Sequence, residues 1–256
     1  RISDRTNIYL IIFLTIFIGL RHDISADWKT YVWAFEDFSD MYFSEISEYR
    51  GEFLYSLLMW IGSNLGGSIY LVNSIFALIF STAFLKFIRS LPRPWLGLTI
   101  SFPYLILVVS MGYMRQGVAI AISLLAINCL ANGKTIRFLI WMLFAGSFHR
   151  GVFILLCLPL ATLDRKITFS FLFKLIGFVF ISLFIIDKLV LSDFDYILRG
   201  YFYNEYDSDG AFIRVMLCFI PSLLFVVKNK VFSLSGNINR IWFLMSVLSI
   251  LMLIGL

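Results

Sequence analysis

Long apolar runs separated by short polar segments make up almost the whole chain. Nine of these runs approach or reach the roughly 20 residues that a helix needs to cross a bilayer. They lie near residues 6–20, 68–85, 95–113, 117–131, 136–148, 151–163, 168–186, 211–227 and 241–256. The pattern predicts an all-α, polytopic integral membrane protein with about nine transmembrane helices, forming a single transmembrane domain over residues 1–256. The first run ends in charged residues instead of a small-residue cleavage site, so we expect it to be retained as a span.

Two longer polar segments interrupt the runs, at residues 21–67 and 187–210. The first contains an apolar stretch at 53–61 that is too short to cross a bilayer. Crossing there would also invert every later basic loop. We therefore expect a helix that lies in the outer membrane interface or dips in and returns.

The composition supports a membrane protein over a soluble domain: 60% of residues are hydrophobic, 18% are aromatic and the mean hydropathy is +0.89. The distribution of charged residues also predicts how the protein is oriented in the membrane. If the N-terminus is cytoplasmic and each run crosses once, 13 of the 21 Lys and Arg residues lie inside with only two of the 16 acids. This split fits the positive-inside rule. The net charge of +5 then reflects cytoplasmic anchoring, and nothing in the sequence indicates nucleic-acid binding.

The three cysteines, Cys129, Cys157 and Cys218, all fall within predicted spans and share no short spacing. Such a set is neither a disulfide framework nor a metal site, so we expect these side chains to pack.

Polar clusters recur at the predicted outer ends of the runs. They are Arg21-His22-Asp23, Arg115-Gln116 and His149-Arg150. The runs 117–131, 136–148 and 151–163 reach only about 20–23 Å as helices, less than the roughly 30 Å hydrocarbon core. Arg115, Gln116, His149 and Arg150 are therefore expected below the headgroup level, where they need a water-filled cavity or protein partners. We infer a cavity that opens outward and is floored by cations. A lipid-linked diphosphate is the membrane-borne anion that suits such a cavity.

Four segments, in order over residues 19–160, resemble the EpsG family of Wzy-like bacterial polysaccharide polymerases. The first is Gly19-Leu20-Arg21-His22-Asp23 with Asp27 and Tyr31 following. The second runs from Glu52-Phe53-Leu54-Tyr55 to Leu58, and the third is Met114-Arg115-Gln116-Gly117-Val118-Ala119. The fourth is Ser147-Phe148-His149 with Pro159 beyond it. Here Arg150-Gly151 follows the Phe-His pair, where the family usually has small residues.

The resemblance implies a membrane glycosyltransferase of the GT-C type that polymerises undecaprenyl-diphosphate-linked repeat units of exopolysaccharide, capsule or O-antigen. It implies a multi-pass protein of the bacterial cytoplasmic (inner) membrane with an active site facing the periplasm or cell exterior. The expected partners are undecaprenyl-diphosphate-linked glycans and the lipid bilayer, with a flippase and a chain-length regulator. Two other functions stay open: a lipid-linked sugar carrier or flippase component, and an O-antigen ligase-like glycosyltransferase. An accessory scaffold is a weaker third.

Arginine is expected to bind the diphosphate, because its guanidinium donates paired hydrogen bonds at any physiological pH. Arg115 is the first candidate, with Arg150 and Arg21 next. The alternative for Arg115 is a side chain that only reaches up to the membrane surface.

His149 and Asp23, with Arg115, are the expected catalytic residues. Histidine is suited to proton transfer near neutral pH, although His149 could instead bond a carbonyl at a helix end. Asp23 and Asp27 are four residues apart and would share a face if helical, as base or sugar ligands. Asp23 could instead pair with Arg21 or Arg115.

The remaining expected substrate-binding residues are His22, Glu52 and Gln116. Glu52 could be only a helix N-terminal charge, and Gln116 could cap the helix it opens. Three aromatic residues, Trp28, Tyr31 and Trp33, are either interfacial anchors or sugar-stacking surfaces. No cofactor and no metal ligand spacing is apparent, so we expect metal-independent transfer that chelators do not abolish.

Overall fold

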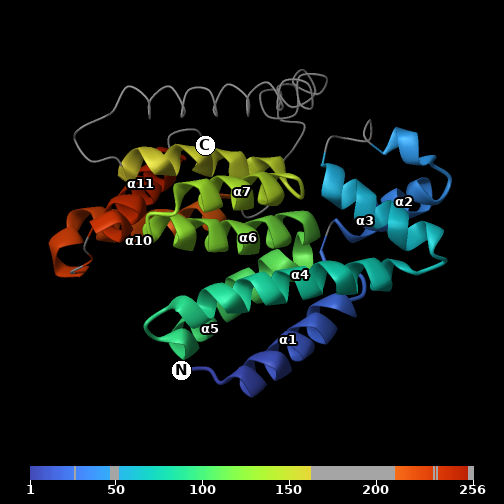
Figure 1. Ribbon diagram of the computed structural model, residues 1–256, viewed down its shortest axis with the longest axis horizontal. Coiled ribbons are helices and arrows are strands. Elements are labelled where there is room, and N and C mark those ends of the chain that lie inside the picture. Colours follow the sequence, from blue (N-terminus) through green and yellow to red (C-terminus); the bar gives the residue numbers. More distant parts are fainter. Residues whose placement is uncertain (26, 47–51, 163–210, 233, 235, 253–256) are drawn as a thin grey trace. The chain divides into compact units, whose positions relative to one another are not determined.

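The computed structural model describes residues 1–25, 27–46, 52–162, 211–232, 234 and 236–252 (Figure 1). The chain divides into two compact units: residues 1–130 with 134–155, and residues 131–133 with 156–256. Every regular element among the described residues is helical, as the apolar pattern predicts. The expected span at 168–186 and the outer segment at 187–210 lie outside the described residues. The expectation of one transmembrane domain over residues 1–256 stays a prediction.

The first unit begins with two antiparallel helices, α1 (Asp4–Gly19) and α4 (Ile69–Ser90). At one end Arg89 Nη2 lies 2.6 Å from a carboxylate oxygen of Asp4. At the other end the backbones approach closely, because a Cβ atom on Gly19 would lie 2.7 Å from Cα of Ser74. The absence of a side chain at Gly19 therefore sets this helix pairing.

The segment between α1 and α4 folds into α2 (Trp28–Ser39), a short 3₁₀ turn η1 (Phe43–Glu45) and α3 (Phe53–Asn64). Glu45 closes the 3₁₀ turn by accepting a hydrogen bond from the backbone N–H of Tyr42 at 2.9 Å. Gly62 lets α3 pack on α4, since a Cβ atom there would lie 2.2 Å from a methyl group of Val72. The helix expected near 53–61 is thus present, whereas the sequence did not single out α2.

Beyond α4, Pro94 opens α5 (Pro94–Ser101), a position where its missing N–H leaves no hydrogen bond unmade. The helix continues as the π-helical stretch η2 (Phe102–Ser110), which has Pro103 at its start. A break at Tyr113 then leads to α6.

The next helices are α6 (Met114–Ala131), α7 (Thr135–Gly146) and the 3₁₀ helix η3 (Arg150–Thr162). Side chains of α4, α6 and α7 line one shared apolar groove, which agrees with the way these helices run side by side (Figure 1). Helix α6 has 18 residues, more than the 15 of the predicted run, so the polar pair Arg115-Gln116 belongs to its first turn. The expectation of an unusually short span is therefore wrong for this helix.

The second unit contains α10 (Ala211–Val227), the turn η5 (Asn229–Phe232) and α11 (Gly236–Met252). Helices α10 and α11 pack together. Asn229 and Asn239 exchange two side-chain amide hydrogen bonds, both 3.1 Å, next to the turn that joins the helices.

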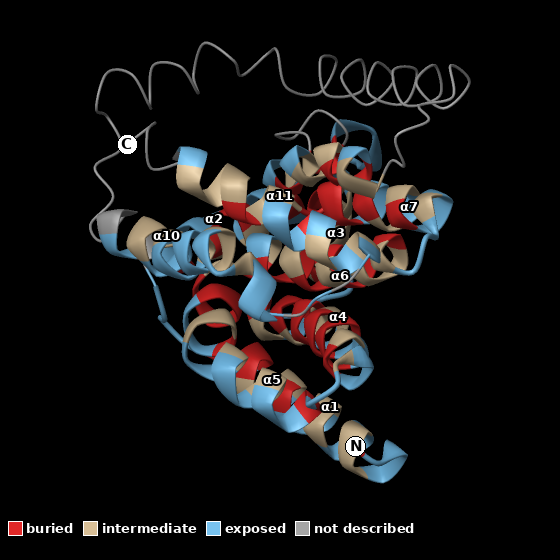
Figure 2. Cartoon of the chain, turned by 90° about the vertical axis from the view of Figure 1, so that its left-hand side faces the viewer, coloured by how far each residue is buried: buried red, intermediate tan, exposed pale blue. Residues whose placement is uncertain are grey.

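Two of the described helices are long and apolar enough to cross a membrane, Ile69–Ser90 and Met114–Ala131. Five shorter apolar helices cover Pro94–Ser110, Thr135–Gly146, Arg150–Thr162, Val215–Val227 and Gly236–Leu251. Buried positions concentrate on α4 and α6 (Figure 2). Helix α1 exposes the large apolar side chains of Ile8, Ile12, Phe13 and Ile16, each about half accessible. An apolar helix surface of this kind is typical of contact with lipid, and the number of spans stays a prediction.

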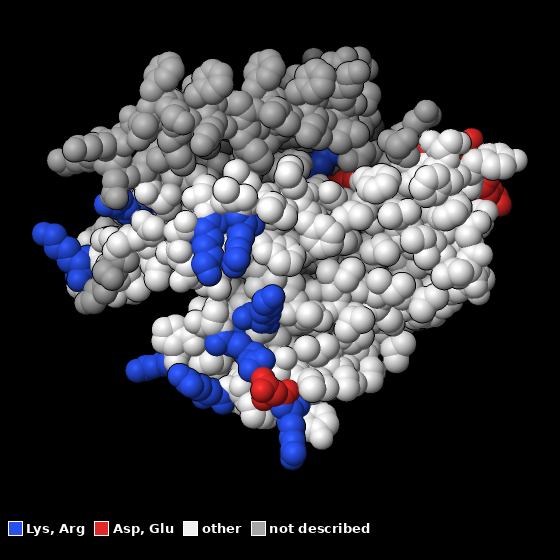
Figure 3. Space-filling model, in the orientation of Figure 1, with Lys and Arg blue, Asp and Glu red and all other residues white. Residues whose placement is uncertain are grey.

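Lys and Arg side chains predominate at one end of the first unit, where Asp4 also pairs with Arg89 (Figure 3). Lys and Arg gather over the end where α1 begins and α4 leads into α5. Acidic side chains appear at the other end, over α2.

Candidate functional site

The first turns of α3, α6 and η3 meet in one region of the first unit, beside α2. Buried aromatic rings hold this region together: the Tyr55 ring contacts Tyr31 at 6.4 Å and Phe76 at 6.0 Å between centroids, and Phe76 contacts Phe148 at 5.7 Å. The backbone N–H of Leu54 donates to the carbonyl of Ser147 at 3.0 Å. This bond joins the first turn of α3 to the end of α7 and brings Glu52 next to His149.

Glu52 lies at the centre of the polar contacts, with its side chain only 8% exposed. Its Oε2 accepts a hydrogen bond from Arg115 Nη1 at 2.8 Å, and its Oε1 lies 3.0 Å from Nδ1 of His149. The backbone N–H of Arg150 also donates to Oε1, at 3.4 Å. Glu52 stands at the N-cap of α3 but makes no capping bond with its side chain. The alternative of a simple helix N-terminal charge is therefore not what the geometry favours.

Arg115 is fixed on three sides. Besides the ion pair with Glu52, its guanidinium lies 4.9 Å from the centroid of the Tyr55 ring, within cation–π range. It also hydrogen-bonds the Tyr31 side chain. One third of the side chain remains exposed. Arg115 is thus held inside the protein and does not only reach for the membrane surface.

The ionisation of two neighbours follows from these contacts. Burial would raise the pKa of the Glu52 carboxyl, but the hydrogen bond from His149 and the charge of Arg115 outweigh it and hold this pKa below its ordinary value. Burial raises the pKa of the Tyr31 phenol, and Asp27 adds to the rise despite the opposing charge of Arg115. At neutral pH Glu52 is therefore an anion and Tyr31 a neutral hydroxyl.

The contact with Glu52 assigns the tautomer of His149. A carboxylate can only accept, so Nδ1 carries the proton and Nε2 of a neutral ring has a free lone pair. Gly151 leaves space beside Nε2, since a Cβ atom there would lie 2.9 Å from it. The imidazole thereby has one oriented nitrogen and one available nitrogen, which is the arrangement of a general base.

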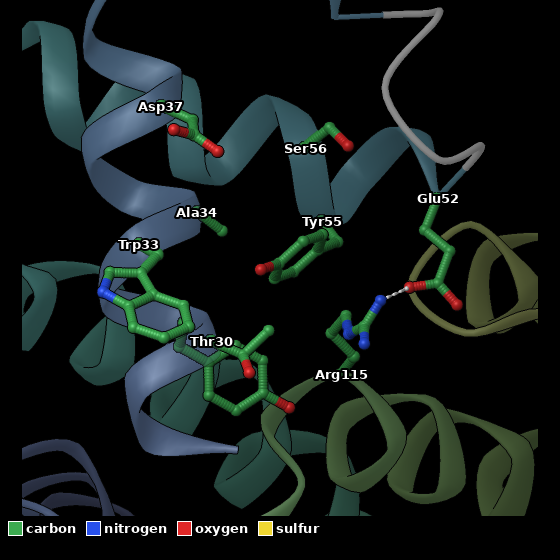
Figure 4. Close-up of a pocket in the computed structure, with 9 residues that line it drawn as sticks. Thr30, Trp33, Ala34, Asp37, Glu52, Tyr55, Ser56 and Arg115 are labelled. Carbon is green, nitrogen blue, oxygen red and sulfur yellow. Dashed lines mark hydrogen bonds and ion pairs between the residues drawn. The ribbon is translucent and has the colours of Figure 1, made fainter. Parts of the chain in front are cut away.

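A half-open cavity of about 160 Å³ lies beside Arg115 (Figure 4). Nine residues line it: Thr30, Tyr31, Trp33, Ala34 and Asp37 of α2, Glu52, Tyr55 and Ser56 of α3 and its cap, and Arg115 of α6. Arg115 is the one cationic side chain of this lining, and it is paired with Glu52. The lining is polar and aromatic, not cationic.

Arg21 lies in a different environment. It is 3% exposed and its guanidinium donates to the carbonyls of Ile18 and Ser110 and to Oδ1 of Asn73, at 3.3–3.5 Å. Burial lowers its pKa to about 10, so it stays charged at neutral pH. Arg21 joins α1, α4 and η2, and it is not among the residues that line the cavity. Its expected role in substrate binding stays a prediction.

The other expected residues lie outside the ion-paired cluster. His22 Nδ1 is 2.7 Å from the hydroxyl of Tyr70. Asp23 has a positive φ of 46° in the turn before α2, and Asp27 is the N-cap of α2, so the two do not share a helix face. Asp23 forms no ion pair with any residue that the structure describes. Gln116 is exposed on α6.

Sequence reasoning missed several residues of the cavity, namely Thr30, Asp37, Tyr55 and Ser56. Thr30, Trp33 and Asp37 are spaced three and four residues apart, so they share one face of a helix. That spacing was a usable signal once α2 was recognised as a helix. Within the described part of the chain, no group of three metal-ligating side chains occurs.

Comparisons with known proteins add one match. No curated protein and no solved structure matches the chain significantly. The model of the EpsG family matches residues 6–256, which is nearly the whole chain and extends well beyond the four motifs. The chain therefore belongs to the EpsG family and is a membrane protein of the polysaccharide-polymerase type.

Proposed function

We propose that this protein is a glycosyltransferase that polymerises undecaprenyl-diphosphate-linked oligosaccharide repeat units on the outer face of the cytoplasmic membrane. The observation that carries the proposal is the buried carboxylate of Glu52, which holds Arg115 on one oxygen and His149 on the other at the edge of a cavity. This arrangement combines a phosphate-binding cation with an oriented proton acceptor.

His149 is the general base of this mechanism. An acceptor hydroxyl hydrogen-bonded to Nε2 attacks the anomeric carbon of the donor sugar, and its proton passes to Nε2. The bond between that carbon and the diphosphate oxygen breaks, and its electron pair leaves with the diphosphate. Glu52 keeps the imidazole oriented and stabilises the imidazolium that forms, because its carboxylate faces Nδ1 at 3.0 Å.

Charge stabilisation of the departing diphosphate falls to the arginines. Arg115 uses Nη1 for Glu52, and its other N–H groups can serve a phosphate oxygen. Arg150 follows His149 directly and is the second candidate. Arg115 thus takes part both in the ion pair and in substrate binding, which fixes its geometry before the lipid arrives.

Charge separation supports the proposed orientation. The basic end of the first unit is opposite the end that carries α2 (Figure 3). By the positive-inside rule the basic end belongs in the cytoplasm, so the Glu52 cluster belongs near the outer face.

Purified protein supplied with undecaprenyl-diphosphate-linked repeat units tests the proposal. Multimers separated by size are expected from the wild type, and Arg115→Ala and His149→Ala should each lower their formation about 100-fold or more. Glu36→Gln, which removes an exposed acid of α2 that does not line the cavity, is the matched control. Wild-type ladders from both site variants would overturn the assignment. Movement of the lipid across a vesicle bilayer without any ladder would favour the carrier function.

A further inference from the structure

One face of α2 forms a wall of the cavity beside Arg115. Thr30, Trp33 and Asp37 all line it and are exposed, and the small side chain of Ala34 lies between them (Figure 4). Trp33 is 63% exposed although it is a large apolar residue. The α2 face therefore presents an indole ring with a carboxylate one turn further along the same helix.

The charges that line the cavity disfavour an anionic occupant beside Asp37. The lining carries one positive charge, on Arg115, and two negative charges, on Glu52 and Asp37. Arg115 and Glu52 neutralise each other at 2.8 Å. Among the described residues, Asp37 forms no side-chain hydrogen bond or ion pair, and it lines the cavity. A phosphate or a carboxylate next to Asp37 would be repelled.

The size and the remaining chemistry fit a sugar ring. A volume of about 160 Å³ corresponds to about five water molecules at roughly 30 Å³ each, which is the space of one ring. A pyranose has an apolar face of C–H groups that packs on an aromatic ring, and its rim of hydroxyls donates to carboxylates. Trp33 and Asp37 offer these two partners, and the exposed hydroxyl of Thr30 offers a further hydrogen bond.

We propose that the cavity between α2 and α3 is the subsite for one sugar ring of the acceptor repeat unit, with Trp33 against the ring face and Asp37 as the residue that selects uncharged or amino sugars over uronic acids. The assignment of this sugar to the acceptor depends on the proposed polymerase function. The cavity adjoins the proposed base through Glu52, which lines the cavity and contacts Nδ1 of His149, while His149 itself is not among the lining residues.

Trp33 also has the ordinary explanation of an interfacial anchor. If Trp33 were only an anchor, a tryptophan at a neighbouring position could replace it. Its effect would then not depend on Asp37. A sugar platform predicts instead that Trp33 and Asp37 act on one ligand, and that charge on the sugar changes the result.

Binding of soluble sugars to the purified full-length protein tests the subsite directly. The probes are neutral hexoses and N-acetylhexosamines, hexosamines and hexuronates, with saturation-transfer NMR as the readout. The wild type should bind neutral and amino sugars and reject hexuronates. Trp33→Ala should weaken binding at least 10-fold, and Asp37→Asn should abolish the discrimination against hexuronates.

Matched controls remove the same chemistry outside the cavity. Glu36→Gln removes the neighbouring acid of α2, and Trp95→Ala removes a half-exposed indole of α5. Both should bind sugars like the wild type. Equal binding by Trp33→Ala and Trp95→Ala, or hexuronates bound as well as neutral sugars by the wild type, would overturn the subsite.

The same variants separate this inference from the polymerase function. In the ladder assay Asp37→Asn should raise the KM for the acceptor and leave kcat within about twofold, whereas His149→Ala should stop extension and still bind free sugars. Sugar binding that depends on Trp33 and Asp37, in a protein that forms no ladder, would overturn the polymerase and support the subsite. A normal ladder with an unchanged acceptor KM in both α2 variants would overturn the subsite alone.

Discussion

Glu52 connects two residues that the sequence suggested only separately. Removing its carboxylate would leave Arg115 partly buried without a counter-charge and His149 without an orienting partner. Breaking one side of such a pair costs about 3–5 kcal/mol when it is fully buried, and less here because one third of Arg115 is exposed. Stability and orientation therefore depend on the same carboxylate.

Acid should remove the stabilisation that the Glu52 carboxylate provides. The pKa of Glu52 is lowered in the folded protein, so its contribution is complete above the unfolded pKa of about 4.3 and is lost as the pH falls through the folded value. We expect wild type to unfold at a higher temperature than Glu52→Gln at neutral pH, with the difference shrinking below about pH 4, where Glu52 takes up its proton. Thermal unfolding in detergent, followed by circular dichroism, measures it. Glu36→Gln should show no such difference, and a gap that persists undiminished well below about pH 4 would contradict the ion pair.

Gly151 gives a second test at the residue scale, directed at the open side of His149. Alanine there would place a Cβ atom 2.9 Å from Nε2 and occupy the approach of the acceptor hydroxyl. Misplacement of this order costs about 100-fold in rate. Gly151→Ala should therefore lower kcat strongly in the ladder assay while the unfolding temperature changes little. Full activity in this variant would mean that the reacting hydroxyl does not approach Nε2.

The residues of the site were predictable individually and their contacts were not. Arg115 and His149 stood out because a cation and an imidazole are rare inside apolar runs. Their shared partner Glu52 lies 63 and 97 positions away in the chain, and no local pattern encodes a contact of that range. The burial of Arg21 between three helices was unpredictable for the same reason.

At the scale of helices, some positions matter because two helix backbones come close together there, and the hydropathy pattern does not reveal them. Gly19→Ala would push a methyl group against the backbone of Ser74, which cannot move without separating α1 from α4. Overpacking of this kind costs about 1–3 kcal/mol. The variant should unfold at a lower temperature in detergent than the wild type. Gly97→Ala is the control, since its nearest neighbour is the flexible end of the Leu91 side chain, and an equal loss in both would refute the argument.

Helix positions were largely predictable because a span must be apolar along its length. The described helices α6, α7 and η3 begin and end within three residues of the expected runs, and α4 extends five residues beyond its run. Two departures have local causes. The polar residues Arg115 and Gln116 hid the first turn of α6, and the charged, aromatic composition of α2 resembled an irregular outer loop. Neither the π-helical stretch of η2 nor the 3₁₀ geometry of η3 has a signal in hydropathy.

For the whole molecule, family membership and the distribution of charge together predict one orientation in the membrane. The EpsG family model covers both units of the chain. In the first unit the basic end and the Glu52 cluster are at opposite ends of the same helices, since α6 begins at Arg115 and leads towards Lys134. An 18-residue helix is about 27 Å long, close to the thickness of a bilayer core. The two ends of α6 should therefore face different compartments.

Cysteine labelling in right-side-out cells tests this orientation. In a background without the native Cys129, Cys157 and Cys218, Asp40→Cys marks the exposed end of α2 and Lys134→Cys the exposed turn between α6 and α7. A membrane-impermeant maleimide should label Asp40→Cys in intact cells, and Lys134→Cys only after permeabilisation. The reversed result would place the Glu52 cluster on the cytoplasmic side, which the proposed polymerisation on the outer face does not allow. Labelling of both from outside would mean that α6 does not cross the membrane, and either outcome would remove the basis for an outward-facing polymerase site.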